Sequence, residues 1–238
     1  MLRLSLSLVL LFGCSAVVAQ IDVTEEDTVE LKPRYKKPDS LKEKTYFRAI
    51  RFGADILALA LSSSDRYNGW EANVDTDFGP FYLAGDYGFA SRDETLETGG
   101  TYHTNGNYWR AGVDVNLLKK DPDRNMLFIG LRYAHSSSSE VLNFTGNDPV
   151  FGPVIYQVTN PSLSGSWGEL VTGLRAKIWK ELWMGFTCRL KVMLAVRGTG
   201  DLAAYYIPGY GVVGGGATWG FNYQLFWRIP YKRQKKAD

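Results

Sequence analysis

The chain has 238 residues, with 27 Lys and Arg against 25 Asp and Glu, and a net charge of +2. This balance excludes the basic face that a nucleic-acid-binding protein needs, so we expect no nucleic-acid partner. The 45% hydrophobic content excludes a disordered chain, and 14% aromatic residues with 25 glycines favour an all-β fold with many tight turns.

The N-terminus predicts export. Residues 1–19 hold one basic residue, Arg3, then an apolar run and small residues up to Ala19, which is the layout of a secretory signal peptide. A lipoprotein signal with an acylated Cys14 is the alternative, and the sequence leaves both open.

Two charged segments flank the central part of the chain. Residues 20–45 carry Pro33 and Pro38, which predicts an extended periplasmic segment, and residues 232–238 form a basic tail. We expect both termini to be periplasmic, as solvated tails near anionic headgroups. The alternative is that both segments dock a periplasmic or outer-membrane protein partner.

Residues 46–231 contain eight segments in which apolar and polar residues alternate with a period of two. Around residue 112, for example, Val113 lies on the apolar face while Arg110 and Asp114 lie on the polar face. The alternation predicts eight β-strands, an even number as in bacterial membrane barrels. The segments cover residues 50–56, 70–78, 81–89, 108–117, 127–134, 169–178, 182–191 and 219–229.

The polar faces of these segments carry charges of both signs, with glycines between them. Because an unpaired buried charge is costly, this balance predicts a closed lumen in which the charges pair. In an eight-stranded barrel the bore is filled by side chains, so we expect no passive pore. The expected ion-pair network consists of Arg51, Asp55, Glu71, Asp75, Asp86, Arg110, Asp114, Arg132, Glu169, Arg175, Lys177, Arg189 and Lys191.

The lengths of the connections distinguish a membrane barrel from a soluble, lipocalin-like barrel. Short connections cover residues 77–80, 119–125 and 179–181, and long ones cover residues 62–69, 91–107, 136–166 and 197–218. Their strict alternation is typical of short periplasmic turns and long outer loops. The sequence therefore predicts a closed, antiparallel, up-and-down transmembrane β-barrel of eight strands in the outer membrane of a Gram-negative cell, in contact with its lipid.

Few residues are candidates for catalysis, and we expect no enzymatic activity, no cofactor and no metal site. The one candidate set is His135, Ser137 and Glu140, because a nucleophilic serine needs a base within reach and an orienting acid. It is similar to the His-x-Ser pair of small outer-membrane lipid A deacylases. By strand phase, His135 and Ser137 would lie on the lipid-facing wall. A serine-rich stretch produces such a pattern easily by chance, so a lipid A-modifying hydrolase is the second alternative function.

Short motifs in the second half of the chain resemble a known family. They are Trp167-x-Glu169-x-x-x-Gly173-x-Arg175, Trp183-Met184-Gly185-Phe186, Tyr206-Ile207-Pro208-Gly209-Tyr210 and Gly220-Phe221-Asn222-Tyr223. With them, residues 46–231 resemble a family of small, uncharacterised outer-membrane β-barrel proteins from Bacteroidota. The resemblance implies fold and location, and it carries over no catalytic residue.

The sequence thus predicts a non-enzymatic integral outer-membrane barrel that acts as a structural anchor or as an accessory subunit of an outer-membrane complex. The first alternative is a surface adhesion or binding barrel that uses the outer loop 136–166, where Phe144, Phe151 and Tyr156 provide aromatic contacts.

Overall fold

The structure is a computed structural model. It describes residues 49–64, 66–78, 81–96, 99–118, 125–200 and 202–230. The predicted signal peptide (1–19), N-terminal extension (20–45) and basic tail (232–238) lie outside the described residues.

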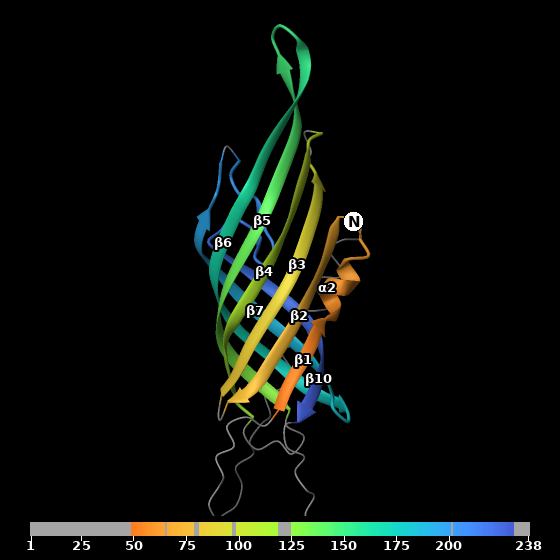
Figure 1. The fold of residues 1–238 in the computed structure, drawn as a ribbon, viewed down its shortest axis with the longest axis vertical. Helices are drawn as coiled ribbons and strands as arrows, with labels where there is room; N and C mark the ends of the chain where they lie inside the picture. Colours follow the sequence, from red (N-terminus) through yellow and green to blue (C-terminus); the bar gives the residue numbers. More distant parts are fainter. Residues whose placement is uncertain are drawn as a thin grey trace, which may run out of the picture. The chain divides into compact units, whose positions relative to one another are not determined.

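Eight antiparallel strands form a closed barrel in the order β1-β10-β7-β6-β5-β4-β3-β2 (Figure 1). The strands of the wall are β1 (Ala49–Asp55), β2 (Tyr67–Phe78), β3 (Phe81–Thr95), β4 (Thr101–Asn116), β5 (Met126–Asp148), β6 (Gly152–Trp179), β7 (Leu182–Arg197) and β10 (Ala217–Pro230). Consecutive strands pair with each other, and the ring closes where β1 pairs with β10, from Ala49 opposite Pro230 to Asp55 opposite Gln224. The predicted all-β, up-and-down arrangement is confirmed.

Burial alternates along the strands of the wall. In β2, Glu71, Asn73 and Asp75 are buried, whereas Trp70, Ala72 and Val74, which alternate with them, are exposed. Successive side chains of a strand point to opposite faces of the sheet, so one face of the wall fills the lumen and the other faces outward. The polar set lies inside and the apolar set outside, the reverse of a soluble barrel.

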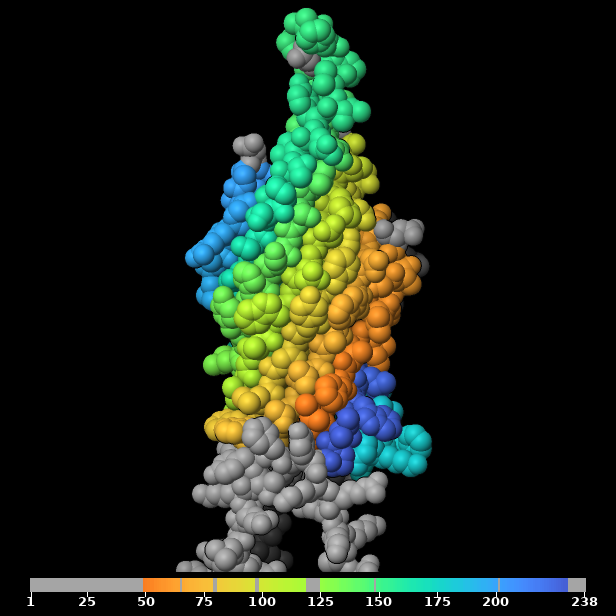
Figure 2. Space-filling view, in the orientation of Figure 1, coloured from red at the N-terminus to blue at the C-terminus, as the bar shows by residue number. Residues whose placement is uncertain are grey.

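Two of the predicted outer loops are mostly strand. β3 continues to Thr95 and β4 begins at Thr101, both within the predicted loop 91–107. β5 and β6 continue to a turn at residues 149–151, within the predicted loop 136–166. Polar residues occupy both faces of these extensions, so the period-two pattern that predicts strands is lost there. The β5–β6 hairpin rises past the other strands of the barrel (Figures 1 and 2).

A short helix follows the first strand. The predicted strand 50–56 ends at Asp55, and α2 (Ile56–Leu61) begins directly after it. The Asp55 carboxylate accepts hydrogen bonds from the backbone N–H of Leu57 (2.9 Å) and Ala58 (3.4 Å), so it caps the helix. Among the described residues, no helix is both long and apolar enough to cross a membrane.

The last predicted outer loop, 197–218, folds back over the lumen. It contains two short strands, β8 (Tyr206–Ile207) and β9 (Gly211–Val212), which pair with each other. Residues 205–213, which we call the lid, bury Ile207 and Tyr210 in an apolar cluster with Trp167. The lid therefore covers the upper end of the lumen.

Candidate functional site

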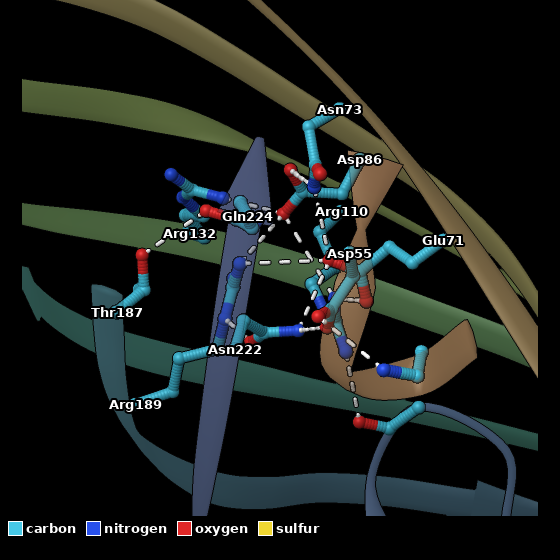
Figure 3. Close-up of polar contacts among 12 residues, drawn as sticks. Asp55, Glu71, Asn73, Asp86, Arg110, Arg132, Thr187, Arg189, Asn222 and Gln224 are labelled. Carbon is cyan, nitrogen blue, oxygen red and sulfur yellow. Dashed lines mark hydrogen bonds and ion pairs between the residues drawn. The ribbon is translucent and has the colours of Figure 1, made fainter. Parts of the chain in front are cut away.

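The centre of the lumen is an ion-pair network around Arg110 (Figure 3). The Arg110 guanidinium lies 2.6 Å from Glu71 Oε2 and 3.1 Å from Glu169 Oε1. Arg189 approaches the same acids from β7, with Nη1 2.9 Å from Glu169 Oε2 and Nη2 3.8 Å from Glu71 Oε1. Asp86 joins them, 3.2 Å from Arg189 Nη2. Each carboxylate thus contacts more than one guanidinium.

The network continues toward the lower end of the barrel. Arg51 and Arg175 both contact Asp75, at 2.6 and 2.5 Å. Arg132 Nη2 and Arg175 Nη2 lie 3.0 and 3.6 Å from Asp114 Oδ2. Because these side chains come from five different strands, the ion pairs link the wall across the lumen as well as along it.

Twelve of the thirteen predicted network residues are buried. Lys177 is the exception: it is exposed near the end of β6, where the register with β7 shifts between residues 177 and 179. The twelve buried residues comprise six acids and six bases. Ten of them form ion pairs with one another, and the other two, Asp55 and Lys191, have neutral hydrogen-bond partners within the described chain.

Apolar groups fill the lumen on both sides of the network. Below it, Met126, Phe128 and Val171 are almost fully buried and form a small cluster. Above it, the lid is fastened to the network itself: Lys191 Nζ donates to the carbonyl oxygens of Gly209 (2.8 Å) and Tyr210 (3.1 Å). The bore is therefore occupied by side chains at its middle and at both ends, as expected for eight strands.

The lid also contacts the extensions of the strands above the barrel. The Arg92 guanidinium lies 5.0 Å from the centre of the Tyr206 ring, and the Tyr206 N–H donates to the Tyr102 hydroxyl at 3.3 Å. Burial raises the pKa of Tyr206 above its ordinary value, although the Arg92 charge opposes this shift. The hydroxyl of Tyr206 is therefore neutral at physiological pH.

Aromatic side chains mark a level on the outer face of the wall. The rings of Trp70 and Tyr87 lie 5.9 Å apart, and those of Trp109 and Tyr133 lie 5.8 Å apart. Below this aromatic girdle the outward-facing residues are large and apolar. They include Phe52, Val74, Phe78, Phe81, Leu83, Val113, Ile129, Leu131, Leu170, Leu174, Phe186, Phe221, Tyr223, Trp227 and Ile229.

The outer face changes character above the girdle. On β4 the outward positions after Trp109 are Asn107 and Asn105, and on β5 those after Tyr133 include Ser137. On β2 the distance from Trp70 to Phe78 is nine residues, close to the 9–11 residues with which a tilted strand crosses a bilayer. The wall thus carries an apolar band of limited height with polar strand extensions above it.

The three candidate catalytic residues do not come together. His135 Nδ1 lies 2.9 Å from Ser166 Oγ, while Ser137 is exposed on the same outer face. Glu140 is fully buried on the opposite face, where its carboxylate accepts hydrogen bonds from the Tyr102 hydroxyl (2.8 Å) and Asn160 Nδ2 (3.2 Å). The acid therefore cannot orient the histidine toward Ser137. The sequence pattern did not indicate the His135–Ser166 contact, because the two residues lie on different strands.

A family model described as "Domain of unknown function (DUF6048)" matches residues 1–234. The chain belongs to the DUF6048 family. Among solved structures it is similar to Neisserial surface protein A (NspA), with a TM-score of 0.35 and 9% identity over 79% of this chain and 98% of that chain. A similarity this low carries no information about function. The curated proteins include no significant match. The Bacteroidota origin that the motifs implied stays a prediction.

In this DUF6048 protein the polar groups of the lumen are arranged for mutual contact. Each guanidinium of the central network is held by carboxylates, and each of those carboxylates accepts from guanidinium, amide, hydroxyl or indole donors. Among the described residues, no group of three or more His, Cys, Asp and Glu side chains is placed to hold a metal ion. The arrangement cross-links the barrel wall.

Proposed function

We propose that this DUF6048 protein is a non-enzymatic integral β-barrel of the Gram-negative outer membrane, which serves as a structural anchor or accessory subunit in an outer-membrane complex. The observation that carries the proposal is the inversion of the barrel: charges of both signs are buried in the lumen, and large apolar side chains cover the outer wall.

The outer wall supports a membrane location. Soluble monomeric proteins rarely expose contiguous apolar patches larger than a few hundred Å². Here the exposed apolar residues occupy every strand of the wall below the aromatic girdle, and Leu131 is 69% exposed. The free-energy cost of exposing this apolar surface is lower in lipid than in water. Aromatic residues at its upper limit match the position of interfacial girdles in membrane barrels.

The filled lumen supports an anchoring role over a transport role. Ion passage would require breaking pairs such as Arg110–Glu71 in a low-dielectric interior and moving the lid. Breaking a buried pair costs about 3–5 kcal/mol. Because these ion pairs hold the interior in place, the barrel keeps its strand extensions in position and does not conduct ions. The separation of Glu140 from His135 and Ser137 argues against the lipid A hydrolase alternative.

The β5–β6 hairpin supports the adhesion or binding alternative. Beyond the pairs that β5 forms with β4, its two strands continue as a ribbon that ends in an exposed apolar tip, where Phe151 is 81% and Ile155 is 77% exposed. The ring of Phe144 stacks on Tyr156, 5.5 Å away, which stiffens the ribbon. A stiff ribbon with an apolar tip at a distance from the barrel is suited to contact a protein partner.

The membrane location is tested by moving one charge along the outer face of β5. In refolding experiments with lipid vesicles, we expect Ile129→Arg, four residues below Tyr133 on the same face of β5, to reduce the free energy of insertion by about 2–4 kcal/mol, the cost of a cation near the bilayer midplane. The control, Ser137→Arg, lies on the same strand and face but above the girdle, and we expect it to cost less than about 1 kcal/mol. Equal effects of the two variants would refute the membrane location.

The closed lumen is tested by single-channel recording. We expect the wild-type protein in planar bilayers to give no stable ion current. Steady currents from a correctly folded barrel would contradict an anchoring role and favour a channel.

A further inference from the structure

The barrel wall has a gap that α2 fills. β1 pairs with β2 and β10 only up to Ala54 and Asp55, but β10 continues upward for another seven residues, from Tyr223 to Ala217. β2 likewise continues from Glu71 to Tyr67, paired with β3. Helix α2 lies in the gap between the two strands and contacts both. In this gap the six residues of α2, about one and a half helical turns, take the place of a strand.

Side chains at the two ends of α2 form hydrogen bonds with the strands on either side of the gap. At its start, Asp55 Oδ1 accepts from the backbone N–H of Tyr223 on β10 (3.2 Å), and Asp55 Oδ2 accepts from Asn222 Nδ2. At its end, Ser62 Oγ bonds both the N–H (2.8 Å) and the carbonyl oxygen (2.5 Å) of Gly69 on β2. The open edges of β10 and β2 are thus bonded to the helix segment only at a few points.

A cavity of about 240 Å³ lies behind α2 and under the lid. Its walls come from α2, the upper part of β10, the lid and the upper end of the ion-pair network. They include Asp55, Ala58, Glu71, Arg110, Lys191 and Asn222. At about 30 Å³ per water molecule, this volume equals roughly eight waters, which is enough for a small polar group.

Two buried charged residues without an ion pair, Asp55 and Lys191, both line this cavity. The Asp55 carboxylate is bonded to backbone N–H groups and to the Asn222 amide, and the Lys191 ammonium is bonded to carbonyl oxygens of the lid. Every other charge of the lumen network lies within 4 Å of an opposite charge. A third buried charge without an ion pair, the Glu140 carboxylate, is bonded to Tyr102 and Asn160 and does not line the cavity. An acid and a base without ion pairs therefore lie together at this cavity.

Their positions on β10 show how close they are. The aliphatic end of Lys191 packs on Gly220, where an added Cβ would lie 2.6 Å from its Cε. Asn222, which bonds Asp55, is the next residue on the same face of β10. Same-face neighbours on a strand are about 7 Å apart. One short molecule with charges of both signs spans this separation.

We propose that this cavity is a binding site for a zwitterionic head group, whose ammonium would contact Asp55 and whose anionic oxygen would contact Lys191. A simple anion would leave Asp55 unpaired, and a simple cation would leave Lys191 unpaired. The paired Arg110 and Glu71 between them add no net charge. A net-neutral ligand is therefore the one that pairs both of these charges in the cavity.

The surroundings of the gap indicate how an attached apolar chain would be accommodated. Leu59 is exposed on the outer side of α2, and Trp219 and Phe221 are exposed on the adjacent part of β10. A lipid head group could enter between α2 and β10 while its acyl chains remain on this apolar surface. This access route rests on the membrane location proposed above, whereas the charge complementarity of the cavity does not.

The test measures binding to the full-length protein refolded in a neutral detergent. By isothermal titration calorimetry we expect saturable binding of glycerophosphoethanolamine, a soluble zwitterion, and at least tenfold weaker binding of inorganic phosphate and of ethanolamine. Native mass spectrometry after reconstitution with phosphatidylethanolamine or phosphatidylglycerol tests the lipid source. Binding of both glycerophosphoethanolamine and phosphatidylethanolamine supports the proposed binding site. Retention of phosphatidylethanolamine without binding of glycerophosphoethanolamine shows that the ligand is a membrane lipid.

Two alanines of α2 provide matched variants. Ala58 is buried and lines the cavity, whereas Ala60 is exposed on the same helix. We expect Ala58→Trp to weaken zwitterion binding at least tenfold and Ala60→Trp to leave it unchanged, with the heat-dependent gel mobility of both barrels as the check on folding. If Ala58→Trp does not fold, Asp55→Asn replaces it, because the amide oxygen keeps the helix cap but loses the charge.

Several outcomes overturn the proposal. They are the absence of saturable binding from both sources, binding of the anionic species as tight as that of the zwitterion, and wild-type binding by Ala58→Trp or Asp55→Asn. The proposed membrane location fails separately: if Ile129→Arg and Ser137→Arg insert equally well while the soluble zwitterion binds, the site stands and the access from lipid does not.

Discussion

Replacing Arg110 with methionine tests the energetic role of the ion-pair network. Methionine keeps most of the length of the side chain but removes the guanidinium that lies 2.6 Å from Glu71 and 3.1 Å from Glu169. Removing one partner of a buried pair costs about 3–5 kcal/mol, because the remaining charge stays buried. Both acids keep other donors, Tyr108 and Arg189 respectively, at 2.8 and 2.9 Å. We therefore expect a loss near the lower end of that range, about 3 kcal/mol.

The assay is equilibrium unfolding in urea of the barrel in lipid vesicles, followed by tryptophan fluorescence. The control is Arg228→Met, which removes a partly exposed pair, Arg228–Glu181 at 3.3 Å, and should cost less than about 1 kcal/mol. The double variant Arg110→Met/Glu71→Gln should be more stable than Arg110→Met by about 1–2 kcal/mol, because the orphaned charge is also removed. If Arg110→Met costs no more than the control, the network does not stabilise the barrel.

Three further predictions concern packing. An added Cβ at Gly112 would lie 2.1 Å from the Leu131 carbonyl oxygen, so Gly112→Ala should reduce the free energy of unfolding in urea by about 1–3 kcal/mol. Gly168 has open space around it, so Gly168→Ala should leave that free energy unchanged. Equal stability of the two variants would show that β4 and β5 can separate. Ile207→Ala in the lid removes a fully buried side chain, so we expect faster proteolysis within residues 199–216 while the barrel keeps its gel mobility, and unchanged proteolysis would mean that other contacts hold the lid. Phe151→Ser should leave the free energy of unfolding within about 0.5 kcal/mol, since the side chain is 81% exposed; a larger loss would mean that the hairpin tip packs on the barrel.

Sequence reasoning succeeded where the two faces of a strand meet different environments. Within the apolar band, Val113 faces outward and Asp114 inward, so the alternation is strong and predicts both the strand and its phase. The lumen charges followed from the same phase. Lys177 was the error, because β6 changes register near its end, where phase no longer fixes orientation.

The sequence signal was weaker where this contrast disappears. Ser136 to Ser139 are polar on both faces, so the continuation of β5 above the girdle resembled a loop. The α2 residues Ile56–Leu61 are all small or aliphatic and show neither a two-residue nor a helical period over six residues. For the lid, a signal was present: Tyr206 to Tyr210 is an apolar stretch within a connection expected to face solvent. The cavity depends on α2 and the lid together, so no single segment could indicate it.

The uneven lengths of the strand pairings have a consequence for the order of folding. β5 and β6 are joined by a tight turn and pair over more than twenty residues, whereas β1 meets β10 over seven pairs that connect the two ends of the described chain. The entropic cost of closing a loop rises with its length, so local hairpins form before distant strands meet. The long hairpin is therefore the natural nucleus, and the β1–β10 contact completes the ring last. The same short contact, beside the helix-filled gap, is where the finished barrel is easiest to reopen.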